Sequence, residues 1–63
     1  NKGITSREID VMRYLYQGYE VKKIADTLCI APSTVQSHSR NIYRKMRVHS
    51  RQELIDQIND SFV

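Results

Sequence analysis

Apolar side chains recur every three or four positions in four short stretches of the chain, which is the spacing of amphipathic helices. The apolar members of the first stretch are Ile9, Val11, Met12, Leu15 and Tyr16. Thr5 and Glu8, three residues apart at the start of this stretch, have the form of a capping box, which predicts a helix start at Thr5. Gly18 predicts its end, because glycine readily adopts the left-handed conformation of a helix cap. Glu8 projects within the apolar stripe, so we expect it either to close the capping box or to meet a cation such as Lys45 or Arg51.

Two helices are predicted in the middle of the chain, at 21–28 and at about 32–47, with a tight link between them. Pro32 suits the first turn of the later helix, where its missing N–H has no helical partner to lose. One side of that helix carries its apolar residues, Val35, Ile42 and Met46. The opposite side carries polar and basic residues at the same spacing, Ser33, Ser37, Arg40 and Arg44. The helix is therefore amphipathic, with a basic outer side.

A last helix is predicted from Ser50 to about Asn59. Ser50 and Glu53 form a second capping box, and the apolar residues that follow are Leu54, Ile55 and Ile58. Links this short require the helices to pack on their sequence neighbours. We therefore expect an all-α fold, a compact four-helix bundle containing a helix-turn-helix, with residues 1–63 forming a single domain.

Length and composition exclude several classes of protein. A chain of 63 residues buries one small core, and no apolar run approaches the about 18 residues of a membrane span. One cysteine, Cys29, excludes an internal disulfide, and one cysteine with two distant histidines does not predict a metal site. Neither a nucleophile–base pair nor a glycine-rich phosphate loop is present, so we expect no enzyme activity and no cofactor. Asn1 in place of Met indicates a fragment, and a reducing cytoplasm is the expected location.

Positive charge is concentrated in one block of the sequence. The net charge is +3 and the isoelectric point about 9.3. No acidic residue occurs between Thr27 and Gln52, a stretch that holds five of the ten lysines and arginines and both histidines. Either a solvated helix surface or a phosphate-binding surface explains such a block.

Two short helices joined by a tight link, the second basic on its outer side, form the helix-turn-helix pattern. A helix fits the major groove of B-DNA, and its first half reaches the base edges. We expect base contacts from Gln36, Ser37 and Arg40, because glutamine pairs with adenine and arginine with guanine through two hydrogen bonds. Basic residues suited to DNA phosphates are Lys22, Lys23, Arg44, Lys45 and Arg47.

The sequence also resembles the LuxR-type (GerE-type) DNA-binding domain of bacterial transcription regulators. The matching stretches are Ile4–Glu8, Gln17-Gly18, Lys22, Ile24–Leu28, Ile30–His38, Asn41–Met46, Val48 and Ser50-Arg51. Any one of these is a weak signal, whereas together they are highly specific and span nearly the whole chain.

This resemblance implies a four-helix domain at the C-terminus of a larger regulator, with a receiver domain, as in a response regulator, or a ligand-sensing domain elsewhere. It implies that the third helix, about 32–47, enters the major groove with Gln36, Ser37 and Arg40 at the bases. Together with the charge pattern, it gives these DNA backbone contacts: Lys22, Lys23, Ser33, Thr34, Asn41, Arg44 and Lys45. It further implies a homodimer through the last helix, for which we expect Ile55 and Ile58 at the seam. Phe62 either joins this seam or caps the core.

Four positions depart from the family pattern. Lysine is frequent in the family where this chain has Gln36, which alters the expected preference at that base step. A hydroxyl residue is usual where this chain has Glu20 and Ala31, so both helix starts lack a strong cap. Glycine is usual at Arg47, which is strained if its backbone is left-handed.

We therefore predict sequence-specific binding of double-stranded DNA by a dimer on a two-half-site operator, in the bacterial cytoplasm, with RNA polymerase as a further candidate partner. One alternative is a promoter-reading domain of a sigma factor, which shares the helix-turn-helix and needs no palindrome. Another is a helical protein–protein interaction module, in which the basic surface is incidental.

Overall fold

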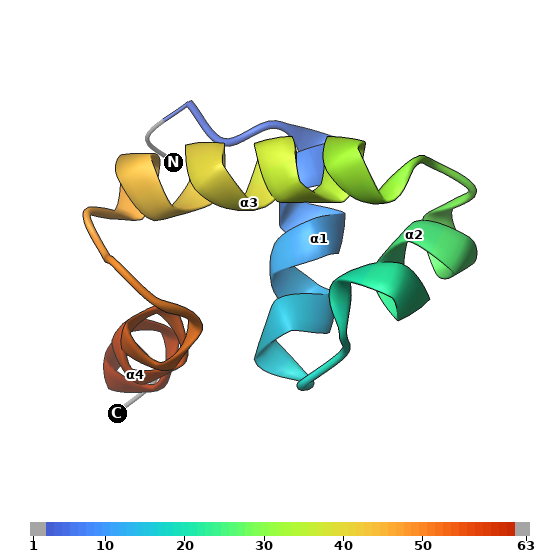
Figure 1. The fold of residues 1–63 in the computed structure, drawn as a ribbon. Helices are drawn as coiled ribbons and strands as arrows, with labels where there is room; N and C mark the ends of the chain where they lie inside the picture. Colours follow the sequence, from blue (N-terminus) through green and yellow to red (C-terminus); the bar gives the residue numbers. More distant parts are fainter. Residues whose placement is uncertain (1–2, 62–63) are drawn as a thin grey trace.

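The computed structural model describes residues 3–61, where the regular elements are four helices. They are α1 (Ser6–Tyr16), α2 (Val21–Leu28), α3 (Pro32–Met46) and α4 (Arg51–Ser61). Helix α3 packs on α1 and α2, and α4 packs on α1. Helices α2 and α4 lie on opposite sides of α1 (Figure 1). The predicted all-α fold is confirmed, and only the outer helix bounds shift, by one or two residues.

Three of the four helices end in the same way. A residue with a left-handed backbone follows each helix: Cys29 (φ 58°) and Arg47 (φ 60°) directly, and Gly18 (φ 89°) after the right-handed Gln17. The next N–H then reaches back to a carbonyl of the last turn, at 3.0, 3.0 and 2.9 Å: Tyr19 to Tyr14, Ile30 to Ala25 and Val48 to Tyr43. These Schellman-type ends reverse the chain sharply and keep the links short. Arg47 thus has the left-handed backbone for which strain is expected, and the left-handed backbone at Cys29 has no glycine signal in the sequence.

The core lies where α1, α2 and α3 converge, and one side chain from α4 closes it. The side chains that are at most 1% exposed are Val11, Leu15, Ile24, Val35, Ile42 and Leu54. Tyr14 and Tyr19 stack at a centroid distance of 4.9 Å across the end of α1 and pack against this core. The apolar side predicted for α3 is therefore the side that anchors it to the rest of the domain.

The predicted apolar stripe of α1 is wrong at Ile9, whose side chain is 47% exposed and not part of the core. The arc of α1 that faces the core carries Glu8, Val11 and Leu15. Ile9 lies to one side of that arc, next to α4, which covers this side only partly.

The second capping box is also corrected. Ser50 Oγ accepts a hydrogen bond from the Glu53 N–H at 3.2 Å, as predicted. Glu53 Oε1, however, accepts from the N–H of His49 at 2.9 Å. The carboxylate thus holds the loop one residue further out than the motif requires.

Candidate nucleic-acid interface

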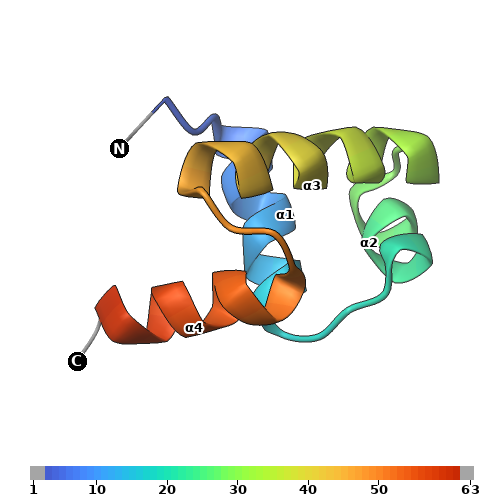
Figure 2. The same cartoon turned by 60° about the vertical axis from the view of Figure 1, so that its left-hand side comes forward.

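Helices α2 and α3 form the helix-turn-helix unit. The link between them holds three residues, because the left-handed Cys29 turns the chain directly from α2 towards Pro32. Helix α2 then lies against the first half of α3 (Figure 2). This packing leaves the opposite side of α3 uncovered.

The uncovered side of α3 carries the predicted base-reading residues. Val35 and Ile42 are fully buried against the core. Gln36, Ser37 and Arg40 are all exposed. Exposed polar and basic neighbours on the same helix are Ser33, Thr34 and Arg44. The structure thus brings these predicted contact residues onto one accessible helix surface, and their individual contacts with DNA stay predictions.

Asn41 and Arg44 are joined on the second half of α3. The Arg44 guanidinium donates a hydrogen bond from Nη2 to the Asn41 side-chain oxygen. Asn41 is half-buried, and Arg44 is exposed. The amide therefore orients the guanidinium, which is a planar donor well suited to a phosphate.

Lys45 makes an internal ion pair. Its Nζ lies 2.8 Å from Glu8 Oε1 and 3.0 Å from the carbonyl oxygen of Gly3. Of the two cations proposed for Glu8, Lys45 is the one observed. The same carboxylate accepts from the Thr5 N–H at 3.1 Å, and Thr5 Oγ1 accepts from the Glu8 N–H at 3.1 Å, so the capping box is confirmed. Lys45 thereby ties the end of α3 to the start of α1.

The Glu8 carboxyl is almost fully buried, at 4% exposed, and it is ionised. The hydrogen bond from Lys45 lowers the pKa of Glu8 below its ordinary value of 4.5, and the bond from the Thr5 N–H lowers it further. Burial acts in the opposite direction and is outweighed. Two of the three donors of Lys45 are engaged in this network, so its predicted phosphate contact stays a prediction.

Lys22 and Lys23 are exposed on the first turn of α2. The Lys23 ammonium lies 4.8 Å from the centre of the Tyr19 ring, as in a cation–π contact. Within the described residues, no side chain caps the first turn of α2 or of α3. The weak caps expected at Glu20 and Ala31 are therefore confirmed.

A hollow lies beside α3, between its flank, the end of α1 and the starts of α2 and α4. We call it the α3 hollow; its volume is about 340 Å³, and its lining residues are Leu15, Val21, Gln36, Ser39, Arg40, Tyr43 and Arg51. Ser39, Tyr43 and Arg51 were not predicted from the sequence to border the DNA-contact surface. The spacing of Gln36, Arg40 and Tyr43 marks one helix flank, but the approach of Arg51 depends on the tertiary packing of α4.

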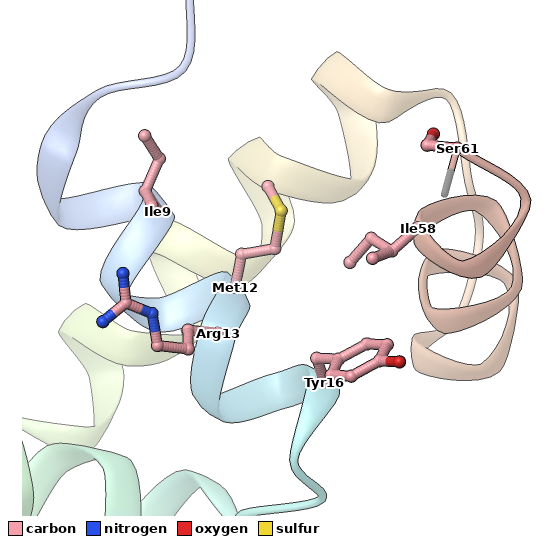
Figure 3. A pocket seen from close by; sticks show the side chains of 6 residues that line it. All are labelled: Ile9, Met12, Arg13, Tyr16, Ile58 and Ser61. Carbon is pink, nitrogen blue, oxygen red and sulfur yellow. The ribbon is translucent and has the colours of Figure 1, made fainter. Parts of the chain in front are cut away.

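A second depression, the α1–α4 groove, has a different chemistry. It holds about 390 Å³ and is lined by Ile9, Met12, Arg13, Tyr16, Ile58 and Ser61; Figure 3 shows Met12, Tyr16 and Ile58 pointing into the space between the two helices. The Tyr16 hydroxyl donates to the Asn59 side-chain oxygen at 2.6 Å and links α1 to α4. Of the predicted seam residues, Ile58 packs against the core and Ile55 is half-buried. Phe62 lies outside the described residues.

The fold and the exposed basic side of α3 define a helix-turn-helix domain of the DNA-binding class. Comparison with known families is decisive: residues 2–58 match the model described as bacterial regulatory proteins of the luxR family, and the chain belongs to this family. The resemblance seen in the sequence is thus confirmed, and the chain is a DNA-binding domain of a transcription regulator. Because the chain belongs to this family, the alternative of a sigma-factor promoter-reading domain is excluded.

Two groups of curated relatives illustrate the match. The chain is 45% identical over 53 residues to the Fimbriae Z protein of Escherichia coli (strain K12), which covers 84% of this chain and 25% of that protein. It is 41% identical over 54 residues to the HTH-type transcriptional regulator MalT of Serratia proteamaculans (strain 568), covering 86% of this chain and 6% of that protein. The chain therefore spans a quarter or less of these relatives.

Neither a membrane span nor a metal cluster occurs among the described residues. None of the four helices is long and apolar enough to cross a bilayer. Residues 3–61 bring together no group of three histidine, cysteine or carboxylate side chains that suits a metal ion.

Proposed function

We propose that this domain binds double-stranded DNA sequence-specifically by inserting α3 into the major groove. The observation that carries the proposal is the division of α3 into two sides. Val35 and Ile42 fix one side in the core, while Gln36, Ser37 and Arg40 are exposed on the other. A recognition helix needs this combination, because a rigid anchor is required to hold flexible hydrogen-bonding side chains at defined base edges.

Base contacts are assigned to the first half and middle of α3. Gln36 is able to donate to and accept from adenine, Arg40 to donate twice to guanine, and Ser37 to bind either type of base. An acidic neighbour would repel the DNA and compete for the arginine, and the stretch from Thr27 to Gln52 contains no acidic residue.

DNA phosphates are assigned to the residues around this surface. They comprise Lys22, Lys23, Ser33, Thr34, Asn41, Arg44 and Lys45. The uncapped first turn of α2 supports this assignment, because N–H groups without a cap at a helix start favour an anion. Lys45 is included because its side chain is partly exposed and Glu8 and Gly3 use only two of its three N–H donors.

The proposed working form is a homodimer through α4, with Ile55 and Ile58 near the seam. Two recognition helices related by a dyad read half-sites about 34 Å apart. We further propose that the chain is the C-terminal part of a longer bacterial cytoplasmic regulator, with a response-regulator receiver or a ligand sensor elsewhere and RNA polymerase as a partner. The small share of the Fimbriae Z protein and MalT that the chain covers supports this organisation.

Enrichment of binding sites from a pool of randomised duplexes at physiological salt tests the proposal. We expect a dyad-symmetric motif with two half-sites. A single asymmetric motif contradicts the dimer and retains base reading. Binding without enrichment contradicts base reading by α3, and absence of binding favours the protein–protein module.

A further inference from the structure

We propose that the α3 hollow is a seat for one sugar–phosphate unit of the DNA backbone, with Arg51 as its principal phosphate ligand. This inference rests on the proposed function and adds to it a contact from α4, a helix assigned until here only to the dimer seam. It also gives Arg40 a second role, because its side chain lines the same hollow.

The lining of the α3 hollow matches the two halves of such a unit. Val21 forms an apolar part above the buried Leu15, and the C–H groups of a deoxyribose pack on it. Arg40 and Arg51 supply two guanidinium groups, the donors best suited to phosphate oxygens. Among the described residues, no carboxylate lines the hollow to compete for them.

Size and position agree with this ligand. Ligand pockets generally run from about 300 to 1,000 Å³, so a hollow of about 340 Å³ is at the small end and fits a single backbone unit. It borders Gln36 and Arg40, the residues proposed to read bases, and Val21, which begins α2 beside Lys22. The backbone that edges a major groove occupied by α3 passes at this position.

Ser39 also lines the hollow. Its Oγ atom is buried beneath this surface and makes no hydrogen bond with the part of the chain that the structure describes. We therefore assign the phosphate to the two guanidinium groups and not to this hydroxyl.

The test compares Arg51→Gln with Arg13→Gln on the duplex recovered by the enrichment experiment. Both substitutions remove one positive charge, but Arg13 lies in the α1–α4 groove, on another side of α1. We expect Arg51→Gln to weaken binding about tenfold, the effect of one charge-assisted hydrogen-bonded contact. The slope of log affinity against log salt should fall by about one. Arg13→Gln should change neither quantity.

Neutral methylphosphonates, placed one at a time along each strand, locate the contact. For the wild-type domain, neutralising one phosphate per half-site should weaken binding about tenfold. For Arg51→Gln the same replacement should cost clearly less than in the wild type, as in a double-mutant cycle, because only the contact with Arg40 remains to be lost. If Arg51→Gln is as sensitive as the wild type at every phosphate that affects the wild type, the seat is refuted.

Arg51→Lys keeps the proposal testable if Arg51→Gln fails to fold. It retains the positive charge, so the salt slope should stay the same, while DNA affinity should drop severalfold because an ammonium lacks the planar pair of donors of a guanidinium. Unchanged affinity for Arg51→Gln and Arg51→Lys overturns the seat alone. Loss of wild-type binding to every duplex overturns the proposed function instead.

Discussion

The α3 hollow and the α1–α4 groove are of similar volume, yet their chemistry differs completely. The first is bordered by two arginines, a buried hydroxyl and an amide. The second is bordered mainly by the apolar parts of Ile9, Met12, Tyr16 and Ile58. Both exist because a core this small covers only part of each helix.

This difference predicts that the two surfaces favour different kinds of ligand. An anion meets two guanidinium groups in the α3 hollow but only that of Arg13 in the α1–α4 groove, where burial of apolar surface is the main driving force. Substitutions in the two places should therefore have separable effects, provided that the junction holding α1 to α3 stays intact. That junction is the Glu8–Lys45 ion pair.

Breaking this junction should have the largest effect, because both surfaces are built on α1. Glu8→Gln removes the ion pair and leaves the partly exposed Lys45 ammonium without its carboxylate, for a loss of about 2 kcal/mol in unfolding free energy. Chemical denaturation of the variant and the wild type measures this. An equal midpoint would mean that the pair contributes no net stability, as for an ion pair on the surface.

The same pair predicts the pH dependence of stability. The pKa of Glu8 is lower in the folded chain than its ordinary value of 4.5. The unfolded chain therefore takes up the proton first as the pH falls, and stability is lost from about pH 4.5 downwards through the folded pKa. Melting temperatures between pH 7 and pH 3 should show this loss in the wild type and a smaller loss in Glu8→Gln.

Arg40→Ala is the next largest change, and it sharpens the distinction between the bases and the backbone. If Arg40 binds guanine with two hydrogen bonds, the variant should lose about 1–3 kcal/mol on the preferred duplex and discriminate less at one base step. Competition binding against all four bases at that step measures both effects. Equal weakening on every sequence would assign Arg40 wholly to the phosphate in the α3 hollow.

The helix pattern and the outer side of α3 could be predicted from the sequence because both follow from local periodicity. Thr5, Gly18 and Pro32 marked helix ends for reasons that act within one turn. The α3 hollow could not be predicted in this way, because Arg51 and Leu15 meet only after α4 packs on α1. Ile9 shows the same limit, since its exposure depends on how much of α1 the short α4 covers.

Lys23→Ala should have a smaller and sequence-independent effect. Lys23 carries one charge near the open start of α2 and already contacts the Tyr19 ring. We expect uniformly weaker binding to preferred and unrelated duplexes, with a salt slope lowered by about one. Titration at four salt concentrations measures the slope. No change in slope would remove Lys23 from the phosphate contacts and leave it as a partner of Tyr19.

Ile9→Ser should have the smallest effect, and it tests the comparison from the apolar side. Ile9 is 47% exposed, so the substitution should change the unfolding free energy by no more than about 0.5 kcal/mol. Affinity for a duplex with one half-site should stay the same, because the α1–α4 groove offers a phosphate no donor comparable to the pair in the α3 hollow. Lower affinity on two half-sites but not on one would extend the proposed dimer seam from Ile55 across this groove. Lower affinity on a single half-site would contradict the separation itself, because it would mean that the apolar side of α1 also takes part in holding the DNA.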